Sequence, residues 1–113
     1  MKIHAKLWLE TDTGKLLVGE GRLDIFRAIQ RTGSLSAAAR ELNMSYRAVW
    51  GKVRTTEERL GVKLIETVAG GHKRGGTHLT KEGINFINQF EKFDRKARRA
   101  IDKLASELLD EMH

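Results

Sequence analysis

The sequence contains no cysteine and no proline. The absence of cysteine excludes disulfide frameworks and thiolate metal sites. The absence of proline means that no rigid proline-rich linker divides the chain. A length of 113 residues fits one compact domain, or one small domain with an extension. We therefore expect a single domain over residues 1–113.

Long apolar runs are also missing. The first ten residues, MKIHAKLWLE, are too polar for a signal peptide, and no segment approaches the length of a membrane span. We expect a cytoplasmic protein with no membrane association. The histidines are scattered at positions 4, 72, 78 and 113, without metal-ligand spacing, clustered carboxylates or a nucleophile beside a base. The sequence predicts no enzyme, no metal and no cofactor.

The chain has a surplus of positive charge. Lys and Arg number 21 against 15 Asp and Glu, which gives a net charge of +6 and a pI near 9.9. A basic surplus in a small protein favours polyanionic partners, and nucleic acid comes first among these. A basic surface that serves solubility alone is the alternative.

The first twenty residues have the pattern of two strands. Apolar and polar side chains alternate over residues 2–10, which is typical of a half-buried strand. Thr11–Gly14 has turn composition, and Lys15–Val18 can return as a second strand. We expect residues 1–20 to form an N-terminal β-hairpin.

Helical spacing follows. It predicts helices over about residues 22–31 and 35–42, and a third that runs to about Leu60. Gly33 is placed for a left-handed cap, while Ser34 and Ser45 can cap the helices that follow them. Two short strands, residues 64–68 and 78–79, then flank the loop GGHKRGGT. Helix, tight turn, helix and hairpin over residues 21–79 predict a winged helix-turn-helix, a mainly α fold with a small amount of β structure.

The third helix has two faces at about 100° per residue. With Arg47 at zero, Gly51 and Arg54 lie at about 40° and 340°. The residues on the opposite side are mostly apolar: Val49, Val53, Thr56 and Leu60. Cations and a small residue on one face suit a helix that enters a major groove. A solvated face is the alternative for the helix as a whole. We expect Tyr46 to pack at the edge of the core, and Trp50 either to pack or to touch DNA.

The loop carries His72, Lys73 and Arg74 between two glycine pairs. Glycines permit positive φ angles, so the backbone can lie close to a sugar-phosphate wall. Lys73 and Arg74 can neutralise phosphates or enter a narrow minor groove. The spacing of a nucleotide-binding phosphate loop is absent, and a merely mobile loop remains the other alternative.

Residues 80–113 read as one long helix, because no breaker appears after Thr80, a suitable cap. Apolar residues recur every three or four positions, as in a coiled coil. They are Phe86, Phe90, Phe93, Ala97, Ile101, Leu104 and Leu108. So small a domain cannot bury the whole stripe, so we predict helix-against-helix dimerisation. Packing against the N-terminal strands is the alternative, and both can hold.

Several motifs together resemble the DNA-binding domain of the ModE family of molybdate-responsive transcription regulators. They are GSLSAAARELNMSYRAVWGKV, ERLGVKLIET, AGGHKRGGT and LTKEG. The helix-turn-helix part alone is also similar to LysR-type regulators. The resemblance implies a homodimer on a pseudo-palindromic operator in double-stranded DNA. The predicted DNA-contacting residues are Ser34, Ser36, Ser45, Tyr46, Arg47, Trp50, Gly51, Arg54, His72, Lys73 and Arg74.

Two departures from the family pattern affect the interpretation. Thr56 stands where related helices usually place a leucine. Family members also carry C-terminal oxyanion-binding domains, which these 113 residues do not supply, so direct molybdate binding is not expected. No effector is identified. A largely non-specific architectural DNA-binding protein, and a protein-interaction module built on the long helix, are the alternative functions.

Overall fold

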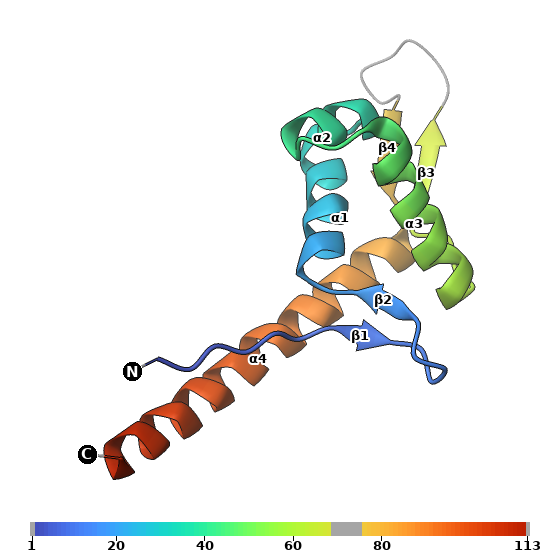
Figure 1. The fold of residues 1–113 in the computed structure, drawn as a ribbon. Coiled ribbons are helices and arrows are strands. Elements are labelled where there is room, and N and C mark those ends of the chain that lie inside the picture. Colours follow the sequence, from blue (N-terminus) through green and yellow to red (C-terminus); the bar gives the residue numbers. More distant parts are fainter. Residues whose placement is uncertain (1, 69–75, 113) are drawn as a thin grey trace.

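The computed structural model describes residues 2–68 and 76–112. Within them the chain forms a winged helix-turn-helix with a long C-terminal helix, as the sequence predicts (Figure 1). The elements in chain order are β1 (Leu9–Glu10), β2 (Leu16–Val18), α1 (Glu20–Thr32), α2 (Leu35–Glu41), α3 (Tyr46–Leu60), β3 (Ile65–Val68), β4 (Gly76–Leu79) and α4 (Lys81–Glu111). Strands β1 and β2 pair antiparallel, and β3 and β4 form the antiparallel wing.

Helices α2, α3 and α4 begin at the predicted caps, whereas α1 begins at Glu20, two residues before the predicted start. The hydroxyl oxygens of Ser34, Ser45 and Thr80 accept hydrogen bonds from the backbone N–H groups of Ala37, Ala48 and Gly83. Each bond satisfies one of the free donors at a helix N-terminus, which stabilises the helix start by about 1 kcal/mol. The glycines after α1 and α3 adopt the left-handed conformation of a C-terminal cap.

The core lies between α1, α2 and α3 and is closed by the wing and the start of α4. Its largest fully buried side chains include Ile25, Phe26 and Ile29 of α1, which recur at helical spacing. Full burial of such a side chain stabilises the fold by about 1.5–3 kcal/mol. The other core members are Ala28, Leu35, Ala38, Ala39, Val49, Val53, Leu64, Leu79 and Ile87.

The predicted strand over residues 2–10 is wrong for most of its length. Only Leu9 and Glu10 pair with β2, because the chain turns into α1 directly after Val18 and Gly19 and offers no further partner. Residues 2–8 run along α4 instead (Figure 1). The guanidinium of Arg98 donates a hydrogen bond to the Ala5 carbonyl at 3.3 Å. The alternation survives only weakly, with Ala5 and Leu7 half-buried.

Helix α4 starts within the domain and then leaves it (Figure 1). A Cβ atom on Gly83, in its first turn, would overlap the Leu64 carbonyl, so only glycine allows this approach. Ile87 and Phe90 are buried, and further along the helix is mostly exposed. The molecule therefore extends over 62 × 30 × 24 Å. No helix among the described residues is both long and apolar enough to cross a bilayer.

Candidate nucleic-acid interface

Helix α3 has one buried face and one exposed face, as the spacing of its residues predicts. Val49, Val53 and Thr56 are completely or almost completely buried, and the two valines belong to the core between α1, α2 and α3. Arg47 and Arg54 point away from the core and are exposed, and Gly51 lies between them. A Cβ atom on Gly51 would meet nothing within 4 Å, so the chain itself leaves this surface open.

Tyr46 and Trp50 lie outside the core. Their exposed fractions are 53 % and 45 %, so the interpretation of Tyr46 as a packing residue is wrong. Tyr46 is the first residue of α3 and precedes the first buried position, Val49. Both rings border a cavity of about 450 Å³ between α3 and the wing, which Arg54 also lines. The arrangement offers aromatic edges beside a cation, a combination suited to bases and sugars.

Arg54 is held between an aromatic ring and a carboxylate. Its guanidinium carbon lies 5.3 Å from the centre of the Trp50 ring. Its Nη2 lies 3.7 Å from Oε1 of Glu58, one helical turn further on. Contacts of this kind are weak at an exposed site, so Arg54 is oriented but free to exchange partners.

Thr56, the departure from the leucine of related helices, has a structural role. Its hydroxyl donates to the Leu17 carbonyl at 3.0 Å and accepts from Arg22 Nη1 at 3.3 Å. Arg22 also donates to the Lys52 carbonyl at 2.7 Å. Burial, and then the nearby Arg59, lowers the pKa of Arg22, which stays charged at neutral pH. Together these bonds join α3 to β2 and to the start of α1.

The buried carboxylate of Glu57 connects α3 to the wing. Its Oε2 accepts hydrogen bonds from the backbone N–H groups of Leu64, at 2.8 Å, and Ile65, at 3.2 Å. Leu64 directly precedes β3 and Ile65 is its first residue, so the carboxylate provides partners for backbone donors at the start of the strand. The position of the wing relative to α3 is therefore fixed by a side chain of α3 itself.

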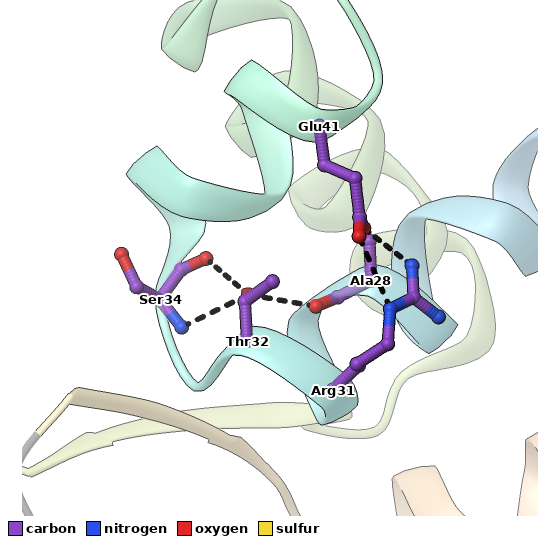
Figure 2. A network of polar contacts seen from close by, with 5 residues as sticks. All are labelled: Ala28, Arg31, Thr32, Ser34 and Glu41. Carbon is purple, nitrogen blue, oxygen red and sulfur yellow. Dashed lines mark hydrogen bonds and ion pairs between the residues drawn. The ribbon is translucent and has the colours of Figure 1, made fainter.

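The turn between α1 and α2 carries the predicted contact residues Ser34 and Ser36. Ser34 caps α2, and Ser36 is exposed in its first turn. Figure 2 shows the hydroxyl of Thr32 bonded to the carbonyls of Ala28, at 2.7 Å, and Ser34, at 3.1 Å. The turn is therefore tied to the end of α1.

Beside this turn, Arg31 at the end of α1 forms a two-pronged ion pair with Glu41 at the end of α2 (Figure 2). The Arg31 Nε–Oε1 distance is 3.1 Å. The hydrogen bond lowers the pKa of Glu41 and raises the pKa of Arg31, since each charge stabilises the other. The ion pair links the last turn of α1 to the end of α2.

The predicted wing residues His72, Lys73 and Arg74 lie outside the described residues. Ser45, the remaining predicted contact residue, caps α3 and is exposed. The spacing argument missed Glu58, whose side chain is 69 % exposed. At 100° per residue Glu58 lies about 20° from Arg47, so extending the wheel by one turn would have found it. We call Arg47, Gly51, Arg54 and Glu58 the exposed face of α3.

The apolar stripe of α4 divides into two parts. Phe86 packs against the core and Phe90 is buried, so both are used within the chain. Ala97 and Ile101 are half-buried. Three large apolar side chains of the stripe beyond Phe90 are exposed: Phe93 at 61 %, Leu104 at 63 % and Leu108 at 47 %. Both packing within the domain and an unpartnered apolar surface are therefore present on one helix.

Comparison with known proteins identifies the family. The family model described as bacterial regulatory helix-turn-helix protein, lysR family, matches residues 21–84, more than half of the chain. The chain belongs to this lysR family. The match runs from the start of α1 through the wing to the first turn of α4. This LysR-type domain therefore comprises the helix-turn-helix and the wing described above.

Relatives of the LysR-type domain confirm the resemblance to ModE. The molybdenum transport protein ModE of Azotobacter vinelandii is 34 % identical over 92 % of this chain and 38 % of that protein. The molybdenum-pterin-binding protein MopB of Rhodobacter capsulatus is 40 % identical over 62 % of this chain and 26 % of that protein. The chain thus spans well under half the length of either relative.

The fold of the LysR-type domain is also found in a protein–DNA complex. The crystal structure of the CbnR DBD–DNA complex matches with a TM-score of 0.59 and 26 % identity, over 77 % of this chain and 94 % of that one. The relatives and the fold are those of DNA-binding transcription regulators, not those of enzymes. Within residues 2–68 and 76–112, no cluster of His, Asp and Glu could hold a metal ion.

Proposed function

We propose that the LysR-type domain serves a transcription regulator by inserting α3 into the major groove of an operator. The observation that carries this proposal is the exposed face of α3. Two arginines flank Gly51 there, while Val49 and Val53 anchor the opposite face in the core. Arginine offers paired donors to guanine O6 and N7, and glycine lets the backbone approach the groove closely.

The remaining predicted contacts divide between bases and backbone. Trp50 and Tyr46 border the cavity beside the wing, where a ring can meet a sugar or a thymine methyl group. Ser34, Ser36 and Ser45 lie at helix starts and can donate their hydroxyls to phosphates. We assign Lys73 and Arg74 to phosphates or the minor groove, with His72 beside them.

We further propose that the domain binds as a homodimer through α4. The exposed Phe93, Leu104 and Leu108 form an apolar surface that a second copy of the same helix would cover. Burial of these side chains against a second copy would remove apolar area from water and so favour association. Phe86 and Phe90 pack within the domain and so hold the start of α4 in place beside this surface.

Charge predicts that the two helices run antiparallel. Residues 91–99 contain five basic and two acidic side chains, whereas residues 102–111 contain four acidic and one basic. A parallel pair would place like charges side by side, and an antiparallel pair places the basic half against the acidic half. The alignment that sets Phe93 opposite the partner's Leu108 also sets Ala97 opposite the partner's Leu104, so large and small side chains alternate.

A two-fold axis through this helix pair implies two inverted half-sites about one or two helical turns apart. Selection from a random duplex pool at physiological salt tests the proposal. We expect enrichment of an inverted repeat, and a dimeric mass by light scattering. A protein that binds DNA but leaves the pool unenriched is instead the non-specific architectural binder. A protein that ignores DNA at modest ionic strength refutes both functions.

Molybdenum occurs in the names of relatives that are much longer than this chain. We propose that these 113 residues bind their operator without molybdate, since the exposed face of α3 needs no ligand to be presented. Operator affinity should be the same with and without about 1 mM molybdate, a concentration at which even a weak ligand would bind. A molybdate-dependent change in affinity contradicts this expectation.

A further inference from the structure

An acidic side chain lies on the exposed face of α3. Glu58 follows Arg54 by one turn and is aligned with Arg47 and Gly51. The residues that the resemblance predicts to contact DNA do not include it, and at 100° per residue it lies about 20° from Arg47. If α3 enters a groove, this carboxylate faces the phosphates and base edges together with the arginines.

The contact between Glu58 and Arg54 contributes little to the fold. Both side chains are substantially exposed, the Nη2–Oε1 distance is 3.7 Å, and salt screens such pairs. The order is also the weaker one, since a cation that precedes an acid by four residues opposes the helix dipole. Arg54 also lies over the Trp50 ring, with its guanidinium carbon 5.3 Å from the ring centre, so Glu58 is not its only contact. A role in stability therefore does not account for Glu58.

On DNA the carboxylate has a definite electrostatic effect. A negative charge beside phosphates weakens binding to every duplex, whatever its base sequence. It also competes with phosphates for the Arg54 guanidinium, because carboxylate and phosphate use the same donors. A guanine that offers O6 and N7 together can replace the carboxylate with two well-directed hydrogen bonds. A single phosphate oxygen offers less, so Glu58 penalises phosphate contacts more than guanine contacts.

We propose that Glu58 is a specificity-determining residue, which keeps Arg54 from serving as a phosphate anchor and so reserves it for a guanine. This inference rests on the proposed function, because it requires α3 to lie in the groove. Specificity is a difference between two affinities, and a repulsive group that weakens incorrect complexes increases it. Glu58 supplies that group at the point where the recognition helix carries its aromatic-stacked arginine.

The test compares Glu58→Gln with Asp24→Asn, which removes the same charge from an exposed position of α1 facing the N-terminal segment and α4. Affinities are measured for the selected duplex and for a random duplex over a range of salt. Glu58→Gln should tighten binding to both duplexes, by about tenfold for the random duplex and by clearly less for the selected one, so that the ratio of the two affinities falls. The salt dependence on random DNA should steepen by about 0.9, the value of one further phosphate contact. Asp24→Asn should alter neither the affinity ratio nor that slope.

A double variant shows whether Glu58 acts through Arg54. In an Arg54→Ala background, Glu58→Gln should change the ratio of selected to random affinity very little. A ratio that Glu58→Gln leaves intact in the unmodified background refutes the inference, and so does an equal change in both backgrounds. Failure of the unchanged protein to enrich any site refutes the proposed function instead. The inference is also tested when no site is enriched. If Glu58→Gln then binds the random duplex no more tightly than Asp24→Asn does, the inference is refuted separately.

Discussion

The backbone N–H of Thr77 donates a hydrogen bond to the carbonyl oxygen of Gly33 at 2.9 Å. This bond joins β4 of the wing to the turn between α1 and α2. The preceding residue, Gly76, has a φ angle of 102° and lies so close to the Gly33 carbonyl that a Cβ atom there would overlap it. The direction in which the wing leaves the domain is thus set by a contact between two glycines.

Replacement of Gly76 by alanine should therefore destabilise the domain. The positive φ angle alone costs a residue with a side chain about 1–3 kcal/mol, and the overlap forces β4 away from the turn. We expect the free energy of unfolding to fall by at least this amount, measured by urea denaturation. A Gly76→Ala variant as stable as the unchanged protein would show that the Thr77–Gly33 bond is dispensable.

The local features of the fold could be predicted because they depend on neighbours in the chain. Ser34, Ser45 and Thr80 cap their helices, and Val49 and Val53 turn inward, as residue type and spacing indicate. The predicted strand over residues 2–8 failed because alternation shows which side chains can share a face, not whether a partner strand exists. Here the chain enters α1 directly after β2, so the segment packs on α4.

Long-range polar contacts were beyond prediction for a related reason. Thr56 reaches a carbonyl 39 residues away, and only the folded chain brings Leu17 beneath α3. The predicted stripe on α4 likewise gave no sign that Phe90 is buried by the chain while Phe93 is exposed. Glu58 differs from these, since its position on the helix face was already contained in the spacing.

Gly51 separates stability from DNA binding. An alanine at this half-buried position of α3 should raise the free energy of unfolding by up to about 1 kcal/mol, because glycine is a poor helix former. A Cβ atom meets nothing within the chain, but it would stand between the helix and the groove. We expect a higher melting temperature with weaker binding to the selected duplex. Unchanged binding would mean that this part of α3 does not approach DNA closely.

Arg47 and Lys73 should have different effects on binding. If Arg47 grips a guanine, Arg47→Ala costs about 1–3 kcal/mol on the selected duplex and much less on random DNA. Lys73→Ala should weaken binding to all sequences and reduce the salt slope by about 0.9. Fluorescence anisotropy titrations on both duplexes at several salt concentrations provide the comparison. Equal losses on every duplex for both variants would contradict this division of roles.

The Arg31–Glu41 pair predicts a pH dependence of stability. The folded state lowers the pKa of Glu41, so its carboxylate stabilises the fold above the unfolded pKa of about 4.3. That contribution is lost as the pH falls through the lower folded value. Below about pH 4.3 the unchanged protein should therefore lose stability more steeply than Glu41→Gln. The free energy of unfolding of both proteins is measured by denaturation between about pH 6 and pH 3, the range in which Glu titrates. The same dependence on pH in both proteins would contradict the prediction.

The antiparallel dimer can be tested by exchanging charges. Its alignment places Lys96 within about 3 Å, along the helix axis, of the level of the partner's Glu107. Lys96→Glu should weaken dimerisation, since like charges then meet twice in each pair. Lys96→Glu combined with Glu107→Lys should restore it, as followed by sedimentation equilibrium. Restoration is not expected from a parallel pair, in which these two positions lie far apart.

Arg27 of α1 forms an ion pair with Glu91 of α4 and donates to Asn88 at 3.3 Å. Gly83 also lies directly against the Leu64 carbonyl. These contacts attach the start of α4 rigidly to the helix-turn-helix and the wing. In a dimer formed through α4, the two helix-turn-helix domains would then keep a constant separation. One extra base pair between the half-sites rotates one of them by about 35° around the duplex. A rigid dimer could not follow this rotation, so a change of spacing would abolish contact with one half-site.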